Sequence, residues 1–313
     1  MGTGHAHYQS DEFSRNMSQL LYSFRDFDDS LPVHFLHIPK TGGSTFGFSL
    51  TKLANALGAH QVSVYAGSDI TAPVLDRIVA HVREAHDTFG AHYFSTAHLP
   101  LATCESAFGK SNLIAILRDP VDRTMSNYCG HFASHNSGAE QGLFNLVNFC
   151  ATAEELFDVY PKPSNLFDNL QVRMLADSPR FSEPCTTAML EEAKRNLSER
   201  FFMWFHIEAM DFCTNLVWKL FGQQRPELET MNVTGDYRDA LTQLMKDWAK
   251  RYNEYDLELY RALGSIDRNV EFEGRRIDVP ENPYPEQVWS IIDPMADETK
   301  VIRGKKPAGE PSP

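Results

Sequence analysis

A short stretch, residues 33–45, limits the possible folds of this chain more than any other part of it. It reads VHFLHIPKTGGST. Residues 33–38 are mostly β-branched or aromatic and are followed by a proline, so we expect a short buried strand there. Ser44 or Thr45 can cap the helix that follows, which should continue through an apolar segment to Leu57. Lys40, two glycines and three hydroxyl residues lie between the two elements.

This connection predicts a phosphate-binding loop. Glycines let the backbone approach an anion, and the N–H groups and the dipole at a helix N-terminus attract it. In a Walker loop the lysine follows the last glycine, whereas here Lys40 precedes Gly42 and Gly43, so a nucleotide triphosphatase is not the natural interpretation. The alternative is a strand–turn–helix junction that is rich in Gly and Ser but binds nothing.

Further strands and helices alternate along the chain. Apolar runs predict strands at residues 61–65 (an edge strand), 91–97, 112–117 and 201–207. Helical spacing of apolar residues predicts helices at 71–87, 144–160, 165–175, 186–200, 211–221 and 237–263. On the helix at 165–175, Asn169, Gln171 and Arg173 are expected on a solvated face. Strands that alternate with helices predict a parallel sheet with helices on both faces.

A second polar motif follows the apolar run at 112–117. It reads RDPVDRTMSNY and begins at Arg118. Asp119 is a good N-cap and Pro120 suits the first helical position, so Arg118 should lie at the carboxyl end of a strand and Ser126 two turns into a helix. Parallel sheets bind ligands at this edge, and an arginine and a hydroxyl can both donate to phosphate. The alternative is that Arg118 pairs with Asp122 or another nearby acid.

Composition narrows the classes of partner. The formal net charge of −13 over 313 residues argues against non-specific binding to nucleic acids or to an anionic membrane surface. Five cysteines, an odd number without C-x-x-C spacing, indicate buried or free thiols in a reducing compartment. No apolar run reaches membrane-spanning length, and we expect a cytoplasmic protein. The histidines near the loop at 130–142, which reads as a lid, show no metal-ligand spacing, so no metal site is expected.

Three segments are expected along the chain. Residues 1–30 are polar and should form an N-terminal arm, residues 31–265 should form the main domain, and residues 266–313 should be a C-terminal extension. The last ten or so residues, from 303 on, are charged and rich in Pro and Gly and should be disordered.

The two strand-end motifs together resemble the sulfotransferases, in particular the family of heparan-type 2-O-sulfotransferases and their bacterial relatives. The stretch HIPKTGGST looks like that family's 5′-phosphosulfate loop, and ILRDPVDRTMSNY looks like its 3′-phosphate motif. Weaker resemblances continue through DNLQVR at 168–173 and YDLELY at 255–260. The match therefore covers roughly residues 33–263.

The resemblance implies a P-loop-like three-layer α/β fold with a central parallel sheet flanked by helices. It also implies transfer of a sulfuryl group from 3′-phosphoadenosine-5′-phosphosulfate (PAPS) to a hydroxyl or amine of a carbohydrate or small-molecule acceptor, without a metal. Thr41, Gly42, Gly43, Ser44 and Thr45 would hold the 5′-phosphate together with Lys40, which would also neutralise charge during transfer. Arg118 and Ser126 would hold the 3′-phosphate.

His98 resembles the position of the family's catalytic histidine. It follows a predicted strand in STAHLP, and an imidazole suits a general base at neutral pH. The alternative is a histidine that is only packed or exposed. His37 lies within the predicted strand, and a structural role is expected for it.

Two other functions stay open. One is a nucleotide or small-molecule kinase of the same fold, which the order of lysine and glycines disfavours, as does the lack of a Walker-B aspartate after an apolar strand. The other is a nucleotide-binding scaffold without activity, which the presence of Lys40 and His98 disfavours. The acceptor and the oligomeric state do not follow from the sequence.

Overall fold

The computed structural model describes residues 22–25, 27–64, 72–89, 93–134, 168–176, 184–226, 243–263, 288–292 and 300–303. The strands are β1 (Tyr22–Phe24), β2 (Val33–Leu36), β3 (His60–Val64), β4 (Tyr93–Ala97), β5 (Asn112–Leu117), β6 (Phe201–His206), β7 (Val288–Ile292) and β8 (Lys300–Arg303). The helices are α2 (Gly43–Leu57), α3 (Ala72–Phe89), α4 (Leu101–Phe108), α5 (Pro120–Ser134), α8 (Leu170–Leu175), α9 (Thr187–Glu199), the 3-10 turn η1 (Ile207–Ala209), α10 (Met210–Leu220), α11 (Gln243–Tyr252) and α12 (Glu254–Leu263).

The eight described strands form one sheet in the order β1-β6-β5-β2-β4-β3-β7-β8. Strands β6, β5, β2, β4 and β3 are parallel, β7 continues the sheet parallel to β3, and the outer strands β1 and β8 are antiparallel to their neighbours. In the register, Leu36 at the end of β2 lies opposite Ala97 of β4 and Ala115 of β5. The residues that follow these three strands therefore meet at the carboxyl end of the parallel sheet.

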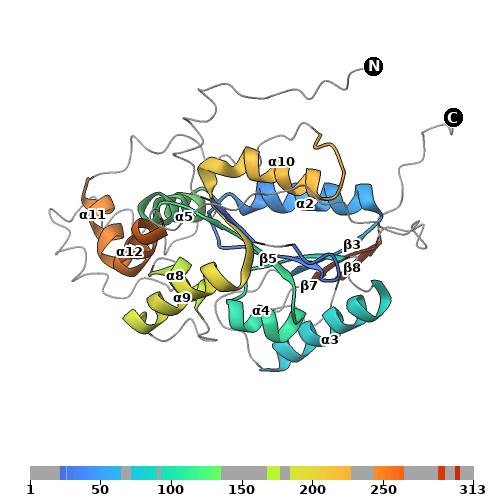
Figure 1. Ribbon diagram of the computed structural model, residues 1–313. Coiled ribbons are helices and arrows are strands. Elements are labelled where there is room, and N and C mark those ends of the chain that lie inside the picture. Colours follow the sequence, from blue (N-terminus) through green and yellow to red (C-terminus); the bar gives the residue numbers. More distant parts are fainter. Residues whose placement is uncertain are drawn as a thin grey trace, which may run out of the picture.

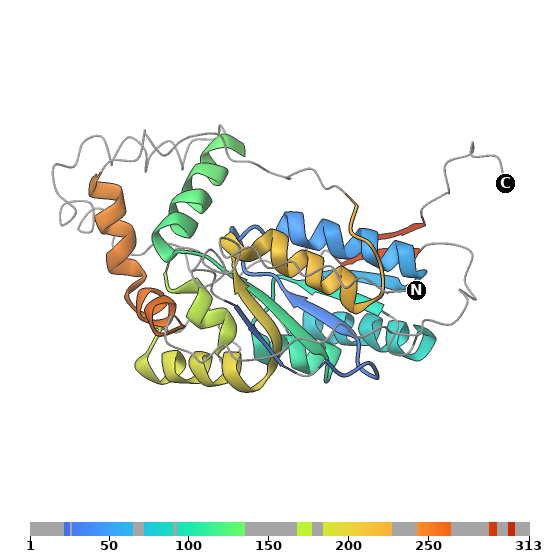
Figure 2. The ribbon, with the colours of Figure 1, turned by 45° about the horizontal axis from the view of Figure 1, so that its top comes forward.

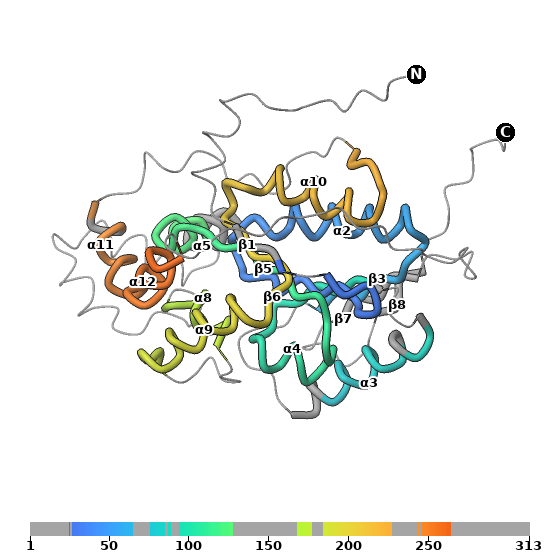
Figure 3. Tube along the Cα trace, viewed as in Figure 1, coloured from blue at the N-terminus to red at the C-terminus, as the bar shows by residue number. Residues whose placement is uncertain are grey.

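Helices cover both faces of this sheet, so the predicted three-layer α/β architecture is confirmed. Helices α2 and α10 lie over one face and α3, α4, α8 and α9 over the other, while α5, α11 and α12 gather at one end (Figure 1; Figure 2). The chain trace follows the same path (Figure 3). Within the described part of the chain, no helix is both long and apolar enough to cross a membrane.

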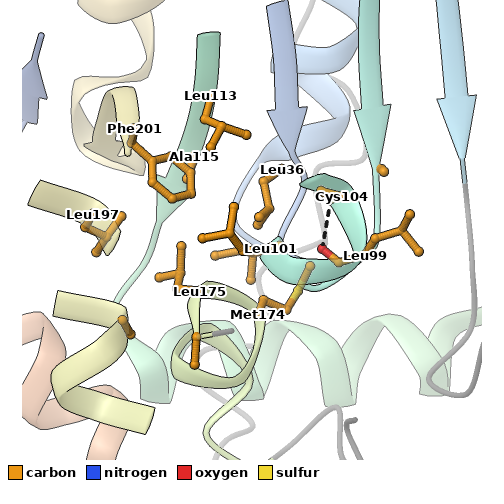
Figure 4. Packing of buried hydrophobic residues seen from close by; sticks show 14 of the residues in the cluster. Leu36, Leu99, Leu101, Cys104, Leu113, Ala115, Met174, Leu175, Leu197 and Phe201 are labelled. Carbon is orange, nitrogen blue, oxygen red and sulfur yellow. Dashed lines mark hydrogen bonds between the residues drawn. The ribbon is translucent and has the colours of Figure 1, made fainter. Parts of the chain in front are cut away.

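The central strands are buried on both faces, which explains their nearly continuous apolar sequences. Along β5, Leu113, Ala115 and Leu117 pack into the core cluster under α4, α8 and α9, whereas Ile114 and Ile116 pack into the cluster under α2 and α10. The close-up in Figure 4 shows the first cluster, in which Leu36 and Ala115 meet Leu101 and Leu175 from the covering helices. The alternation follows from the two-residue period of a strand.

The structure differs from the sequence predictions in the outer part of the sheet. The predicted edge strand at 61–65 is the inner strand β3 (His60–Val64), because β7 pairs with its outer side. The sequence analysis assigned no strand to β1, β7 or β8, although β1 lies in the predicted arm and β7 and β8 in the predicted extension. Strand β2 ends at Leu36, two residues earlier than predicted.

Two helix predictions are also corrected. The long helix predicted at 237–263 is divided into α11 and α12 at Asn253 in its described part. The buried Asn253 amide donates to Ala249 O over 2.7 Å and to Thr124 Oγ1 over 3.1 Å. Such side-chain hydrogen bonds compete with regular helix geometry. In the predicted helix at 165–175, only Leu170–Leu175 is described as helical, after Asn169 in a left-handed conformation.

Other predictions agree closely with the structure. The strand at 112–117 is β5, and α9, α10 and α3 begin and end within two residues of their predicted bounds. Residues 130–134 of the predicted lid belong to α5. The rest of that loop and the predicted helix at 144–160 lie outside the described residues. Of the end predicted to be disordered from 303 on, Arg303 belongs to β8 and the remainder lies outside the described residues.

Candidate functional site

The loop between β2 and α2 turns through two left-handed residues. Lys40 has a φ of 69° and Gly42 a φ of 85°. The Thr41 hydroxyl donates to Ile38 O over 2.8 Å and closes the turn. The N-cap of α2 is Gly42, which has no side chain to form a capping bond, and Ser44 and Thr45 lie inside the helix. The predicted cap at Ser44 or Thr45 is therefore wrong. A left-handed N-cap favours glycine, which explains why the helix begins directly after it.

The N-terminus of α2 presents backbone donors. The N–H groups of Thr45 and Phe46 donate to Gly42 O over 3.1 and 3.4 Å. The helical bonding pattern therefore starts at Thr45, and the N–H groups of Gly43 and Ser44 have no acceptor within the helix. Left-handed residues next to such donors form concave anion sites in proteins, and the helix dipole adds to the attraction. The geometry fits the predicted phosphate loop.

Close packing requires both glycines of the loop. A Cβ on Gly42 would lie 2.8 Å from Met210 Cε and 2.9 Å from Ile207 Cδ1, at the start of α10 and in η1. A Cβ on Gly43 would lie 2.0 Å from His37 Cδ2. The loop after β2 is thus wedged between the segment after β6 and the ring of His37. These contacts leave no room for a side chain at either position.

Arg118 joins the second motif to this loop. It follows β5 directly, and its guanidinium donates from Nη1 to the main-chain O of Lys40 over 3.1 Å. The two predicted anion-binding motifs, 78 residues apart in the chain, therefore touch. Strands β2 and β5 are neighbours. The chain after β2 continues to β3 on one side of the pair, and the chain after β5 continues to β6 on the other side. The contact therefore lies at a topological switch point, where open α/β sheets bind their ligands.

The helix after Arg118 starts as predicted. Asp119 Oδ1 accepts from the N–H groups of Val121 and Asp122, each over 2.9 Å, and Pro120 is the first helical residue. Ser126 lies in the second turn of this helix, α5, and is half-buried. Arg118 and Ser126 are thus carried by one strand–helix unit, as the spacing predicts.

A buried amide fixes the backbone of Arg118. Gln171 in α8 accepts from Arg118 N and donates to Arg118 O, both over 3.0 Å. Asp256 in α12 accepts from the N–H groups of Gln171 and Val172 over 3.0 and 2.8 Å and so caps α8. Burial raises the pKa of the Asp256 carboxyl, and the positive charge of the buried Arg123 in α5 opposes this shift. This polar network holds the end of β5 in place.

The same segment corrects the prediction of a solvated helix face. Asn169, Gln171 and Arg173 are 6%, 1% and 2% exposed. Asn169 Oδ1 accepts from the N–H groups of Tyr255 and Asp256, and the Arg173 guanidinium pairs with Asp168 over 2.6 Å. Buried polar groups need such partners, which α12 supplies to Asn169 from more than 80 residues away and which Asp168 supplies to Arg173 locally.

Two histidines meet beside the loop. His98 follows β4, and its Nε2 lies 2.9 Å from Nδ1 of His37, which follows β2. The rings are in an edge-to-face arrangement with centroids 4.2 Å apart. Burial lowers the pKa of His98 to about 4, and burial together with the charge of His98 holds the pKa of His37 well below its ordinary value. Both rings are therefore neutral at pH 7.

The sequence analysis did not anticipate the contact between His37 and His98. It placed His37 inside the strand, but β2 ends at Leu36 and His37 lies one residue beyond it. The signal that could have found it is positional: a histidine directly before a glycine-rich loop, at a strand end. Its partner His98 is 61 residues away, and only the pairing of β2 with β4 brings them together.

The side chains described at these strand ends are suited to binding an anion. Among the residues that the structure describes, no cluster of three or more His, Cys, Asp or Glu could hold a metal ion. Lys40, Arg118 and the N-terminus of α2 instead gather positive charge and N–H donors at one strand edge, with a neutral imidazole pair beside them. That arrangement can bind an anionic donor and accept a proton. Comparisons with known proteins add no family to this description: no protein-family model matches the chain, and no curated protein matches it.

Proposed function

We propose that the protein is a sulfotransferase that moves a sulfuryl group from PAPS to a hydroxyl or amine. The observation that carries this proposal is the 3.1 Å contact between Arg118 Nη1 and Lys40 O, because it unites two anion-binding motifs in one site. PAPS has two separate anionic ends, a 5′-phosphosulfate and a 3′-phosphate. A site with two anion-binding elements at adjacent strand ends suits such a donor better than one with a single loop.

Each element has a proposed part in the reaction. The backbone from Thr41 to Thr45 binds the 5′-phosphate, and Arg118 with Ser126 binds the 3′-phosphate. Lys40 stabilises the negative charge that develops on the leaving phosphate oxygen, as cationic groups do in phosphoryl transfer. Since Lys40 and the helix N-terminus supply this positive charge, the proposal needs no metal.

His98 is the proposed general base. It follows the strand next to β2 and is neutral at pH 7, so it can take the proton of an acceptor hydroxyl or amine. The acceptor is proposed to be a carbohydrate or a small molecule. A cytoplasmic location is proposed with it, because the thiols of Cys104, Cys185 and Cys213 are free.

The experiment is transfer of labelled sulfate from PAPS into a panel of carbohydrates and small hydroxyl or amine compounds, read by mass. The matched control is Lys40→Ala protein, which should transfer far less. In a thermal melt, 3′,5′-adenosine bisphosphate (PAP) should raise the melting temperature, because a ligand that binds the folded state stabilises it. ATP with magnesium should raise the melting temperature less. A melting temperature that rises with ATP and not with PAP would refute the proposal in favour of a kinase.

A further inference from the structure

The ring of His37 is held on three sides. It stacks on Phe35 with centroids 5.2 Å apart and an angle of 19° between the rings. It lies against Gly43, where a Cβ would come within 2.2 Å of Nε2. Its Nδ1 faces His98 Nε2 over 2.9 Å. With an exposed fraction of 5%, this ring has little freedom to turn and presents one fixed nitrogen to His98.

The proton between the two rings has two possible positions. A hydrogen bond between two neutral imidazoles uses one N–H and one bare nitrogen. If His37 donates, the proton of His98 sits on Nδ1, and His98 has no bare nitrogen left for a substrate proton. If His98 donates from Nε2, its Nδ1 carries the lone pair that a general base needs. The tautomer of His98 thus decides whether it can act.

We propose that His37 is a positioning residue for the general base: by accepting a hydrogen bond at Nδ1, it holds His98 in the tautomer that has its proton on Nε2. This inference rests on the proposed function, because it assigns His37 a part in the reaction of that site. The location of Nε2 of His37 over the first residue of α2 bears on which of the two rings becomes charged. The positive end of the helix disfavours a second positive charge there, so His37 stays neutral and His98 carries the added proton.

The step is balanced in atoms and charge. The acceptor oxygen forms a bond to sulfur while the bond from sulfur to the 5′-phosphate oxygen breaks, and that electron pair leaves with PAP. The acceptor's proton moves to Nδ1 of His98, which becomes an imidazolium. Its Nε2–H then donates to neutral His37 Nδ1, and a hydrogen bond with a charged donor is stronger than a neutral one. The hydrogen bond between the two rings is therefore stronger in the transition state than before transfer.

Two variants of His37 separate the effect of its hydrogen-bond acceptor from the effect of its packing, because their new side chains have the same number of heavy atoms. His37→Leu and His37→Asn both remove the ring, but only asparagine can place an acceptor oxygen near the position of Nδ1. His37→Leu should lower kcat by about tenfold or more, the effect of losing one hydrogen bond. It should leave the KM for PAPS nearly unchanged, and His37→Asn should recover most of the loss in kcat.

A buried histidine elsewhere supplies the control. His34 lies in β2, three residues before His37, is fully buried, and pairs with Ser95 Oγ over 2.7 Å on the side of α4, where its ring stacks on Phe108. His34→Leu should lower the melting temperature and leave kcat unchanged. In a His98→Asn background, His37→Leu should cause no further loss of kcat, because the base that it positions is gone.

Imidazole ¹⁵N NMR reads the tautomer directly and does not depend on activity. Wild-type His98 should carry its proton on Nε2 near pH 7, and His37→Leu should mix the two tautomers. A wild-type His98 protonated on Nδ1, or equal kcat in the Leu and Asn variants of folded protein, would overturn the inference. A wild-type protein that transfers no sulfate overturns the proposed function instead. The two failures are therefore distinguishable.

Discussion

The guanidinium of Arg118 donates a hydrogen bond to the main-chain carbonyl oxygen of Lys40 over 3.1 Å. Lys40 has a left-handed backbone, which is costly for a residue with a side chain. The contact helps to hold this conformation, because it fixes the direction of the Lys40 carbonyl group. Arg118 thus supports the loop that contains Lys40, in addition to its proposed role as a ligand for the 3′-phosphate.

Arg118→Ala should weaken PAP binding by about 1.5–3 kcal/mol, the range for hydrogen bonds to charged groups. The fold should survive, since Arg118 lies at a strand end and its side chain is only partly buried. Isothermal titration with PAP measures the change. Arg195→Ala is the control, because Arg195 is an exposed residue of α9 and its loss should leave the affinity unchanged. An unaltered affinity in folded Arg118→Ala protein would remove the 3′-phosphate role.

Lys40→Ala should lower turnover by about 10²–10³, the usual cost of losing one preorganised charge-stabilising donor. PAP affinity should fall less, because the interaction is strongest in the transition state. Lys40→Gly removes the same charge and also relieves the left-handed strain, so it should be as inactive but more stable than Lys40→Ala in a thermal melt. Equal losses in binding and turnover would make Lys40 a simple anchor.

His98→Asn should reduce turnover by about 10²–10⁴ while PAP affinity stays nearly intact, because a general base acts only on the transferred proton. Burial lowers the pKa of His98 to about 4, so the rate of the wild-type protein should be flat from neutral pH down to about pH 5 and fall below it. The pH profile of kcat/KM tests this. A rate that already halves between pH 7 and 6 would indicate another base.

Acid should destabilise the fold through its buried histidines. Burial lowers the pKa of His34 to about 3 and that of His98 to about 4, below the ordinary value near 6.5. The unfolded chain therefore binds more protons as the pH falls below 6.5, and each group lowers the free energy of unfolding by up to about 1.4 kcal/mol per pH unit until its folded pKa is reached. Urea unfolding at pH 7, 6 and 5 measures this slope. His34→Leu should reduce the pH dependence of the free energy of unfolding by up to the contribution of one proton. An identical slope in this variant would contradict the lowered pKa of His34.

Two glycines of α2 should respond to alanine in opposite directions. At Gly43 a Cβ would lie 2.0 Å from His37 Cδ2, so Gly43→Ala should cost about 1–3 kcal/mol by overpacking and should lower turnover by displacing that ring. At Gly47 the nearest atom to a Cβ is Thr96 Oγ1 at 4.0 Å, so Gly47→Ala should stabilise the helix by about 0.5–1 kcal/mol. Thermal melts of both variants measure the two changes in stability. Similar melting temperatures would contradict the packing seen around His37.

Much of the local structure could be predicted from the sequence because its signals lie within a few residues. The apolar run from Asn112 to Leu117 predicts a buried strand, and the Asp-Pro pair after Arg118 predicts the start of α5. The glycines after Lys40 predict an open helix N-terminus. These features depend on period, capping and backbone freedom, which a chain carries in its local order. They place Lys40 and Arg118 at strand ends without any knowledge of the other strands.

The sequence by itself thus determined that a strand leads into a helix around Lys40 and again around Arg118, although not the last residue of β2 or the cap of α2. Only the tertiary structure decided that β2 lies between β4 and β5, which brings His37 to His98 and Arg118 to Lys40. It also decided that the Gln171 side chain is buried, although its helix alone would place it toward solvent, because the main chain of Arg118, 53 residues away, supplies its hydrogen-bond partners. The physical reason is that strand order and the burial of polar groups depend on contacts between segments far apart in the chain, which no local pattern records.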